Sequence, residues 1–100
     1  MGASSCRYVV FEFRLVEKEK YSGRVVFPPV NEFSDSATYA NQVYDTCVRQ
    51  VPNGRFMLVL FEKDRKTKEI TWTVLKAQHN QGIPVDRLIT AYQRKFSWRS

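Results

Sequence analysis

Hydrophobic residues recur at every second position along residues 7–16 (RYVVFEFRLV), which places Val9, Phe11 and Phe13 on one side of the chain. This period of two, in a segment rich in β-branched and aromatic residues, predicts a β-strand. After a charged tract containing a glycine, residues 24–27 (RVVF) resume the pattern until two prolines end it. Proline cannot donate to a strand ladder, so the two segments are predicted to form a hairpin joined by a polar loop.

The period changes in residues 34–51, where hydrophobic residues recur at spacings of three and four, as one face of a helix requires. These positions are Ala37, Ala40, Val43, Tyr44, Cys47, Val48 and Val51. Ser34, Asp35 and Ser36 precede them and supply side-chain oxygens of the kind that cap a helix N-terminus. The following Pro-Asn-Gly at 52–54 ends the predicted helix and turns the chain.

Residues 55–62 (RFMLVLFE) form the most continuous apolar run, which is typical of a strand in the middle of a sheet. A polar turn at 63–68 leads to alternating residues 69–76 (EITWTVLK), a second hairpin. Pro84 then suits the first turn of a helix, where its missing N–H costs nothing. The hydrophobic positions of this second helix fall on one face and are expected to pack in the core. They are Val85, Leu88, Ile89, Tyr92 and Phe96.

The order of elements, ββαββα, predicts an α+β domain. The most economical arrangement is a two-layer sandwich, with a four-stranded antiparallel sheet of order 2-1-3-4 and both helices on one face. A β-grasp-like roll is the alternative, although that fold usually has a central fifth strand. Residues 7–100 are expected to form this single domain, and residues 1–6 a flexible N-terminal tail.

The net charge of +6 is unevenly distributed. Residues 7–51 hold six basic and six acidic residues, whereas residues 52–100 hold ten basic and four acidic ones. A localised basic excess suits an acidic partner such as nucleic acid, an acidic protein or an anionic membrane. The alternative is that the charge serves only solubility.

The predicted topology brings two basic segments together. The second helix runs back toward the 63–68 turn, so its basic C-terminus should lie beside that turn, with the start of the first strand at the same end. The resulting candidate basic patch comprises Arg7, Lys63, Arg65, Lys66, Lys68, Arg94, Lys95 and Arg99. Trp98 is a candidate contact aromatic beside it, because Arg and Trp anchor interfaces and stack on bases; buried, it would belong to the core.

The sheet face away from the helices is a second candidate surface, because exposed apolar residues on a sheet usually find a cover. The residues expected there are Tyr8, Val10, Arg14, Arg24, Val26, Thr71 and Thr73. Homodimerisation through this face is the favoured interpretation, and stacking of single-stranded bases is the alternative.

Candidate catalytic and metal-binding chemistry is sparse. The chain has two cysteines, Cys6 and Cys47, without zinc-site spacing, and its one histidine, His79, falls in a predicted loop. Cys47 lies on the apolar helix face, where a small buried side chain is expected. Neither a glycine-rich phosphate loop nor a carboxylate pair at catalytic spacing occurs, so an enzyme, a cofactor or a metal is not expected.

The sequence contains no apolar run long enough to span a membrane and no secretory signal, so a cytoplasmic chain with reduced thiols is expected. The favoured function is a non-enzymatic interaction module that forms a homodimer, or binds another protein, through its sheet. A nucleic-acid-binding domain that uses the basic patch is the alternative. A small-molecule-binding domain, with a pocket between sheet and helices, is the third interpretation.

Overall fold

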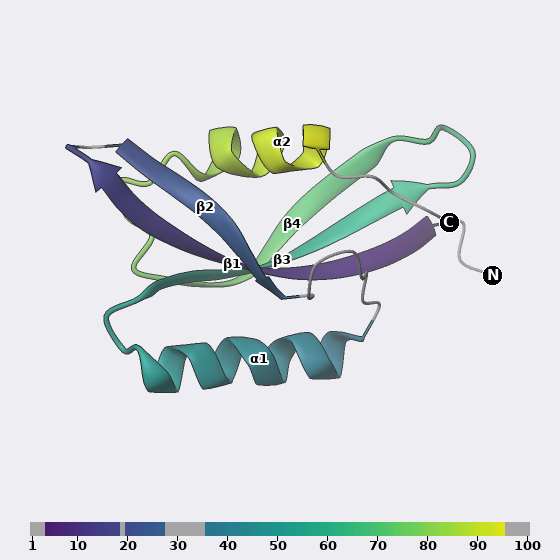
Figure 1. The fold of residues 1–100 in the computed structure, drawn as a ribbon. Helices are drawn as coiled ribbons and strands as arrows, with labels where there is room; N and C mark the ends of the chain where they lie inside the picture. The colour runs from purple at the N-terminus through teal and green to yellow at the C-terminus, as the bar shows by residue number, and fades with distance from the viewer. Residues whose placement is uncertain (1–3, 19, 28–35, 96–100) are drawn as a thin grey trace.

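The structure is a computed structural model that describes residues 4–18, 20–27 and 36–95 (Figure 1). Its elements follow the predicted order of two strands, a helix, two strands and a helix. They are β1 (Ser4–Glu17), β2 (Lys20–Phe27), α1 (Ala37–Gln50), β3 (Arg55–Asp64), β4 (Ile70–Gln78) and α2 (Val85–Lys95).

The four strands form one sheet of order β2-β1-β3-β4 in which every neighbouring pair is antiparallel. The predicted α+β class, the ββαββα order and the strand order are therefore confirmed. The two central strands are those with the most apolar sequences, and Val9 of β1 lies opposite Val59 of β3. In the described residues no fifth strand joins this sheet, so the β-grasp-like alternative does not apply.

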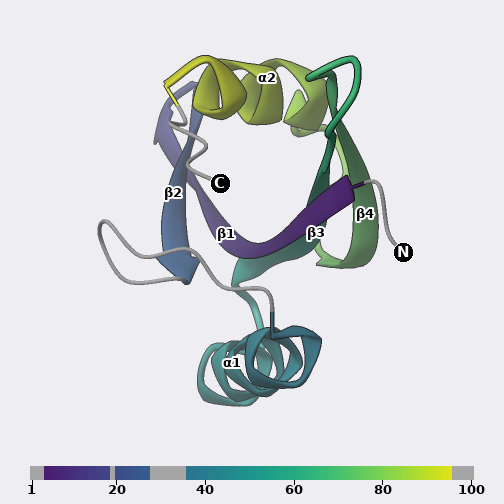
Figure 2. The ribbon, with the colours of Figure 1, turned by 90° about the vertical axis from the view of Figure 1, so that its right-hand side faces the viewer.

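The two helices pack on opposite faces of the sheet, and the prediction that both lie on one face is wrong in this respect. The sheet is curved into a trough; α2 lies across its open side, and α1 lies against its outer side (Figure 2). The physical reason is that β1 and β3 are apolar on both sides. A strand of this kind leaves hydrophobic surface in water unless both faces are covered.

Two hydrophobic cores result, one on each face of the sheet. The core under α2 is built around Val9, Phe11, Phe13, Met57, Val59, Phe61, Ile83 and Ile89. The core under α1 is built around Val10, Phe27, Ala40, Tyr44, Phe56 and Leu58. The odd-numbered residues of β1 from Val9 to Phe13 face α2, whereas Val10 faces α1, as the period of a strand requires.

The N-terminal boundary of the domain differs from the expected one. Residues 4–6, assigned to a flexible tail by the sequence, belong to β1, and Ser4 lies opposite Asp64 of β3. Cys6 continues this pairing opposite Glu62. Strand pairing thus orders backbone that has no hydrophobic pattern of its own. Residues 1–3 of the expected tail lie outside the described residues.

Both helices begin with the predicted signals. The Ser36 side chain accepts a hydrogen bond of 3.1 Å from the Tyr39 backbone N–H and so caps α1. Pro84 precedes α2, and its carbonyl oxygen accepts from the Leu88 N–H at 3.1 Å. The proposed caps Ser34 and Asp35, and the core position Phe96, lie outside the described residues.

Ile89 of α2 is fully buried, as predicted, and three further predicted residues pack against the same core. These are Val85, Leu88 and Tyr92. Tyr92 meets the Phe11 ring edge to face, with 5.1 Å between ring centroids. Ile83, which the sequence pattern left in a loop, is also buried in this core and anchors the entry to α2.

Candidate functional site

The β3–β4 turn is held by the Asp64 side chain. Its Oδ1 atom accepts backbone hydrogen bonds from Lys66 at 2.7 Å and from Thr67 at 3.1 Å. The hydrogen bond from Thr67 has the largest effect and that from Lys66 the next largest; both lower the pKa of the Asp64 carboxyl below its usual value. The ordered turn leaves the side chains of Arg65, Lys66 and Lys68 exposed to solvent.

The C-terminal half of α2 lies at the same end of the molecule as this turn (Figure 1). The Gln93 side chain donates a hydrogen bond of 3.5 Å to the Ile70 carbonyl, at the start of β4 beside the turn. Arg94, the next residue of α2, is exposed, and Lys95 is the last residue of this helix. Tertiary structure therefore brings together two basic segments that are far apart in the sequence.

Two further members of the candidate basic patch lie on strands at this end. Lys63 of β3 is half-buried and pairs with both Ser5 and Ile70. Arg7 of β1 lies opposite Phe61 and is half-buried, and its Nη1 donates to the Cys6 carbonyl at 3.0 Å. Arg99 and Trp98 lie outside the described residues, so the position of the candidate contact aromatic stays a prediction.

The predicted open sheet face is largely covered, because α1 packs on it. Val10 is fully buried, and Tyr8 and Val26 pack against the same core as α1. The prediction that this face is free for dimerisation is therefore wrong for these three residues. Of the other residues expected there, Thr71 and Thr73 are exposed on β4.

Arg14 and Arg24 are exposed, and both engage Glu12 rather than presenting free charge. The Glu12 Oε1 atom lies 2.8 Å from Arg24 Nε and 3.3 Å from Arg14 Nε. This cluster lies close to Cys47 of α1. Burial raises the pKa of the Cys47 thiol, Glu12 raises it further, and Arg24 lowers it. Cys47 is therefore held as a thiol, which disfavours a role as a nucleophile.

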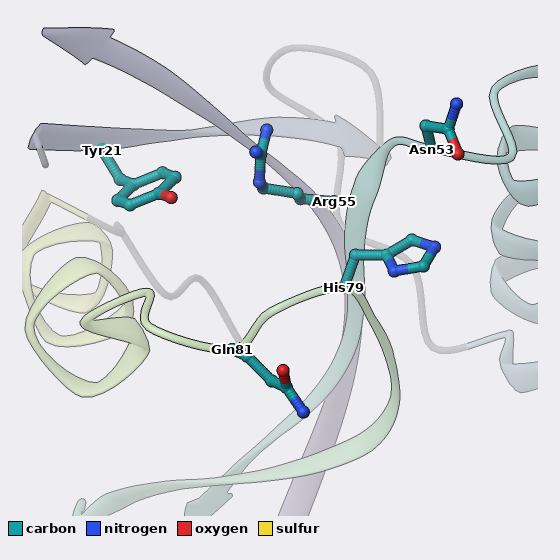
Figure 3. Close-up of a pocket in the computed structure, with 5 residues that line it drawn as sticks. All are labelled: Tyr21, Asn53, Arg55, His79 and Gln81. Carbon is teal, nitrogen blue, oxygen red and sulfur yellow. The ribbon is translucent and has the colours of Figure 1, made fainter. Parts of the chain in front are cut away.

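A polar depression of about 320 Å³ opens where β3 begins and β4 ends, which is the end of the sheet opposite the β3–β4 turn. Figure 3 shows the side chains that line it. Of the residues that the structure describes, five side chains from four segments line it: Tyr21 of β2, Asn53 of the α1–β3 loop, Arg55 of β3, and His79 and Gln81 of the β4–α2 loop. The Arg55 guanidinium carbon lies 5.5 Å from the centre of the Tyr21 ring. None of these five described residues is acidic.

Hydrogen bonds between the two loops fix one wall of this depression. Gln78 Nε2 donates to the carbonyl oxygens of Pro52 and Gly54, each at 3.0 Å. His79 Nε2 lies 3.1 Å from the Pro52 carbonyl oxygen, and because a carbonyl only accepts, this nitrogen carries the hydrogen. His79 also has a φ of +53°, in the left-handed region that non-glycine residues seldom adopt.

Sequence patterns did not single out the depression, although a signal for it existed. In an antiparallel pair, the start of β3 lies beside the end of β4, and Phe56 faces Gln78. The two polar loops adjoining these positions must therefore meet. The same topological reasoning that joins the basic turn to α2 would have joined Asn53 and Arg55 to His79.

The outer edge of β4 is a third candidate surface. Val74 and Leu75 are 37% and 44% exposed, respectively. Leu75 lies at an irregularity in the β3–β4 ladder, because Leu58 pairs with Lys76 and Val59 with Val74. Lys76 turns toward α1, where its Nζ lies 3.5 Å from Asp45 Oδ1. The segment of β4 before the irregularity, Ile70–Val74, contains no charged residue.

Neither α1 nor α2 is long and apolar enough to cross a membrane, in the part of the chain that the structure describes. Among the same residues, no three His, Cys, Asp or Glu side chains gather as a metal site would require. Comparison with protein-family models, with curated proteins and with solved structures finds no match.

Proposed function

We propose that the chain is a binding module rather than an enzyme, and that it pairs with a second copy of itself through the β4 edge. The observation that carries this proposal is that β4 ends the sheet with its outer edge uncovered by either helix (Figure 2). An edge strand presents unpaired backbone N–H and C=O groups, which a further strand can satisfy. Pairing of two β4 edges would continue the sheet across both copies.

The two edges of the sheet differ in character. The β2 edge carries Lys20, Gly23 and Arg24, and charged residues and glycine are typical of edges that resist pairing. The first five residues of β4, Ile70–Val74 (ITWTV), are uncharged and rich in residues that favour strands. The β4 edge is thus the better candidate for association.

Antiparallel pairing of β4 with its copy, centred on Trp72, would place Thr71 directly opposite Thr73 and Ile70 opposite Val74. Threonine pairs and β-branched pairs are favourable across neighbouring strands. In this register Lys76 of one copy would lie level with Lys68 of the other, outside the five paired residues, and Lys76 is directed toward Asp45 of its own chain. A symmetric partner therefore suits this edge without any change to its sequence.

Light scattering coupled to size-exclusion chromatography tests the proposal. The wild type should elute with twice the chain mass of 11.8 kDa. The double variant Thr71→Lys, Thr73→Lys places lysines opposite each other and should elute as a monomer. The double variant Thr71→Glu, Thr73→Lys restores opposite charges at each pair and should recover the dimer. A wild type that stays monomeric at high micromolar concentration would overturn the proposal.

The matched control is the double variant Thr38→Lys, Thr46→Lys. It adds the same charge at two exposed threonines of α1 and should remain a dimer. If this control dissociates as readily as the β4 variant, net charge rather than the β4 edge governs association.

Nucleic-acid binding at the basic end is the second candidate. Its support is the gathering of Arg65, Lys66 and Lys68 in an ordered turn, at the same end of the molecule as the C-terminal half of α2, which carries the exposed Arg94. Affinity for single-stranded oligonucleotides should fall with salt, with a log–log slope of about −0.7 for each phosphate neutralised. The variant Lys66→Glu, Arg94→Glu should lose this binding, whereas Arg49→Glu, at the far end of α1, should retain most of it. Equal losses would argue against the basic end as the site.

A further inference from the structure

Arg55 is half-buried, and within the described part of the chain its guanidinium has no carboxylate partner. Among the described residues it makes no ion pair or hydrogen bond, and its contact is with the face of the Tyr21 ring at 5.5 Å. A cation–π contact uses the plane of a guanidinium and leaves its N–H groups, which point outward in that plane, available to acceptors. Tyr21 thus orients Arg55 while leaving its hydrogen-bonding capacity unused.

The other groups around the depression are also suited to an acceptor. Asn53 and Gln81 carry amide N–H donors, and Tyr21 carries a phenolic O–H. His79 uses its Nε2–H toward the Pro52 carbonyl and so holds its loop against the wall of the depression. Among the described residues, none that lines the depression is acidic, so a half-buried arginine and several donors line it without a described anion to balance them.

The wall formed by the two loops is ordered before any ligand arrives. Gln78 links Pro52 and Gly54, and His79 links to Pro52, so the loops that carry Asn53 and Gln81 are joined to each other. Pre-organisation of this kind lowers the entropic cost of binding. His79, whose φ is +53°, is held in this conformation beside the Pro52 carbonyl by its own side-chain hydrogen bond.

We propose that this depression binds a small ligand through an oxyanion, a phosphate or carboxylate group that Arg55 would hold at its centre. Arginine pairs with both groups through two parallel hydrogen bonds, and the amides and Tyr21 would bind the remaining oxygens. The volume of about 320 Å³ is at the small end of the range for ligand pockets, which suits a small metabolite rather than a polymer. The site is independent of the β4 edge and lies at the opposite end of the sheet from the basic turn.

Titration of the isotopically labelled full chain with sodium phosphate, and separately with sodium malonate, tests the proposal by NMR. Sodium chloride at matched ionic strength provides the reference. Saturable shifts should appear at the backbone amides of 53–55, 79–81 and Tyr21 with phosphate, malonate or both, and the stronger of the two identifies the preferred group. The Arg55→Gln variant should weaken this binding at least tenfold.

Two further variants keep the result interpretable. His79→Asn retains a residue that tolerates positive φ, and Tyr21→Phe retains the ring beneath Arg55; both should weaken binding while the spectrum stays native. The matched control Arg65→Gln removes an arginine from the β3–β4 turn and should bind as the wild type does. Shifts that are no larger than those from sodium chloride would overturn the proposal. So would equal binding by Arg55→Gln, or a loss in Arg65→Gln that matches it.

Discussion

Val9 and Val10 are neighbours in β1, yet they are buried under different helices, at 1% and 0% exposure. Val9 belongs to the core that α2 covers, and Val10 to the core that α1 covers. The central strands are therefore buried on both sides, although the sheet is antiparallel throughout. This arrangement leaves the β4 edge, the basic turn and the polar depression as the candidate surfaces.

Truncation of either valine should destabilise the protein while loosening a different helix. Val9→Ala and Val10→Ala should each lower the free energy of unfolding by about 2 kcal/mol, because both remove buried methyl groups. Hydrogen exchange should quicken mainly in α2 for Val9→Ala and mainly in α1 for Val10→Ala. Val16→Ala, an exposed site at the end of β1, should stay within about 0.5 kcal/mol of the wild type. Faster exchange in the same helix for both variants would contradict the placement of the helices.

A methyl group at Gly54 should clash with the core. A Cβ atom there would lie 2.4 Å from Cε2 and 2.8 Å from Cζ of Phe56, which is only 3% exposed. Gly54→Ala should therefore cost about 1–3 kcal/mol, measured by urea denaturation. The loss should shrink in a Phe56→Leu background, because the crowded ring is gone.

Gly82→Ala separates crowding from backbone strain. No atom lies within 4 Å of a Cβ at this position, but its φ is +78°, so only the conformational cost of about 1–2 kcal/mol applies. Replacement of Phe56 by Leu should leave that cost unchanged. If Phe56→Leu reduces the stability losses of Gly54→Ala and Gly82→Ala equally, the contact between residue 54 and Phe56 does not cause the loss at Gly54.

The β3–β4 turn should weaken in acid. The pKa of Asp64 is lowered on folding by hydrogen bonds from the Thr67 and Lys66 N–H groups, so its stabilisation is complete above the unfolded value of 3.8. That contribution should be lost as the pH falls below 3.8 through the lower folded value. Melting temperatures between pH 2 and 6 should fall less steeply for Asp64→Ala than for the wild type. Glu69→Ala, which removes a nearby exposed carboxylate, should retain the wild-type slope.

Alkaline pH should destabilise the core under α2. Burial raises the pKa of Tyr92 from 10.0 to about 12, so the folded state favours the neutral phenol. The associated stability is fully present below pH 10 and is lost as the pH rises toward 12. Urea midpoints should therefore fall less for Tyr92→Phe than for the wild type over this range. Tyr39→Phe, at an exposed site on α1, should follow the wild type.

Local patterns in the sequence predicted the elements and their order well. The period of two in residues 7–16, and the continuous apolar run at 55–62, identified β1 and β3 as the central strands. The capping residues at 34–36 and Pro84 marked the starts of both helices to within three residues. These signals depend on neighbouring residues, so they can be read without knowledge of the fold. Pairing of residues 4–6 was missed, because those residues take their order from β3 rather than from their own pattern.

The helix patterns alone could not predict which face of the sheet each helix covers. An amphipathic helix shows which of its sides is buried but not which side of a sheet it covers. The information lay in the strands, since β1 and β3 are apolar on both sides and each face needs a cover. The expected dimer face is covered by α1 for this reason, whereas the β4 edge is covered by neither helix.

The sequence by itself determined the strands, the helices, the strand order and the basic character of the second half, because period, turn residues and charge are local properties of the chain. Only tertiary structure decided that α1 and α2 would lie on opposite faces, and that Arg55 would lie over Tyr21 beside the loops of Asn53 and His79. The physical reason is that such contacts join residues distant in the chain. Their geometry is set by sheet curvature and by packing on both faces at once, which no single segment encodes.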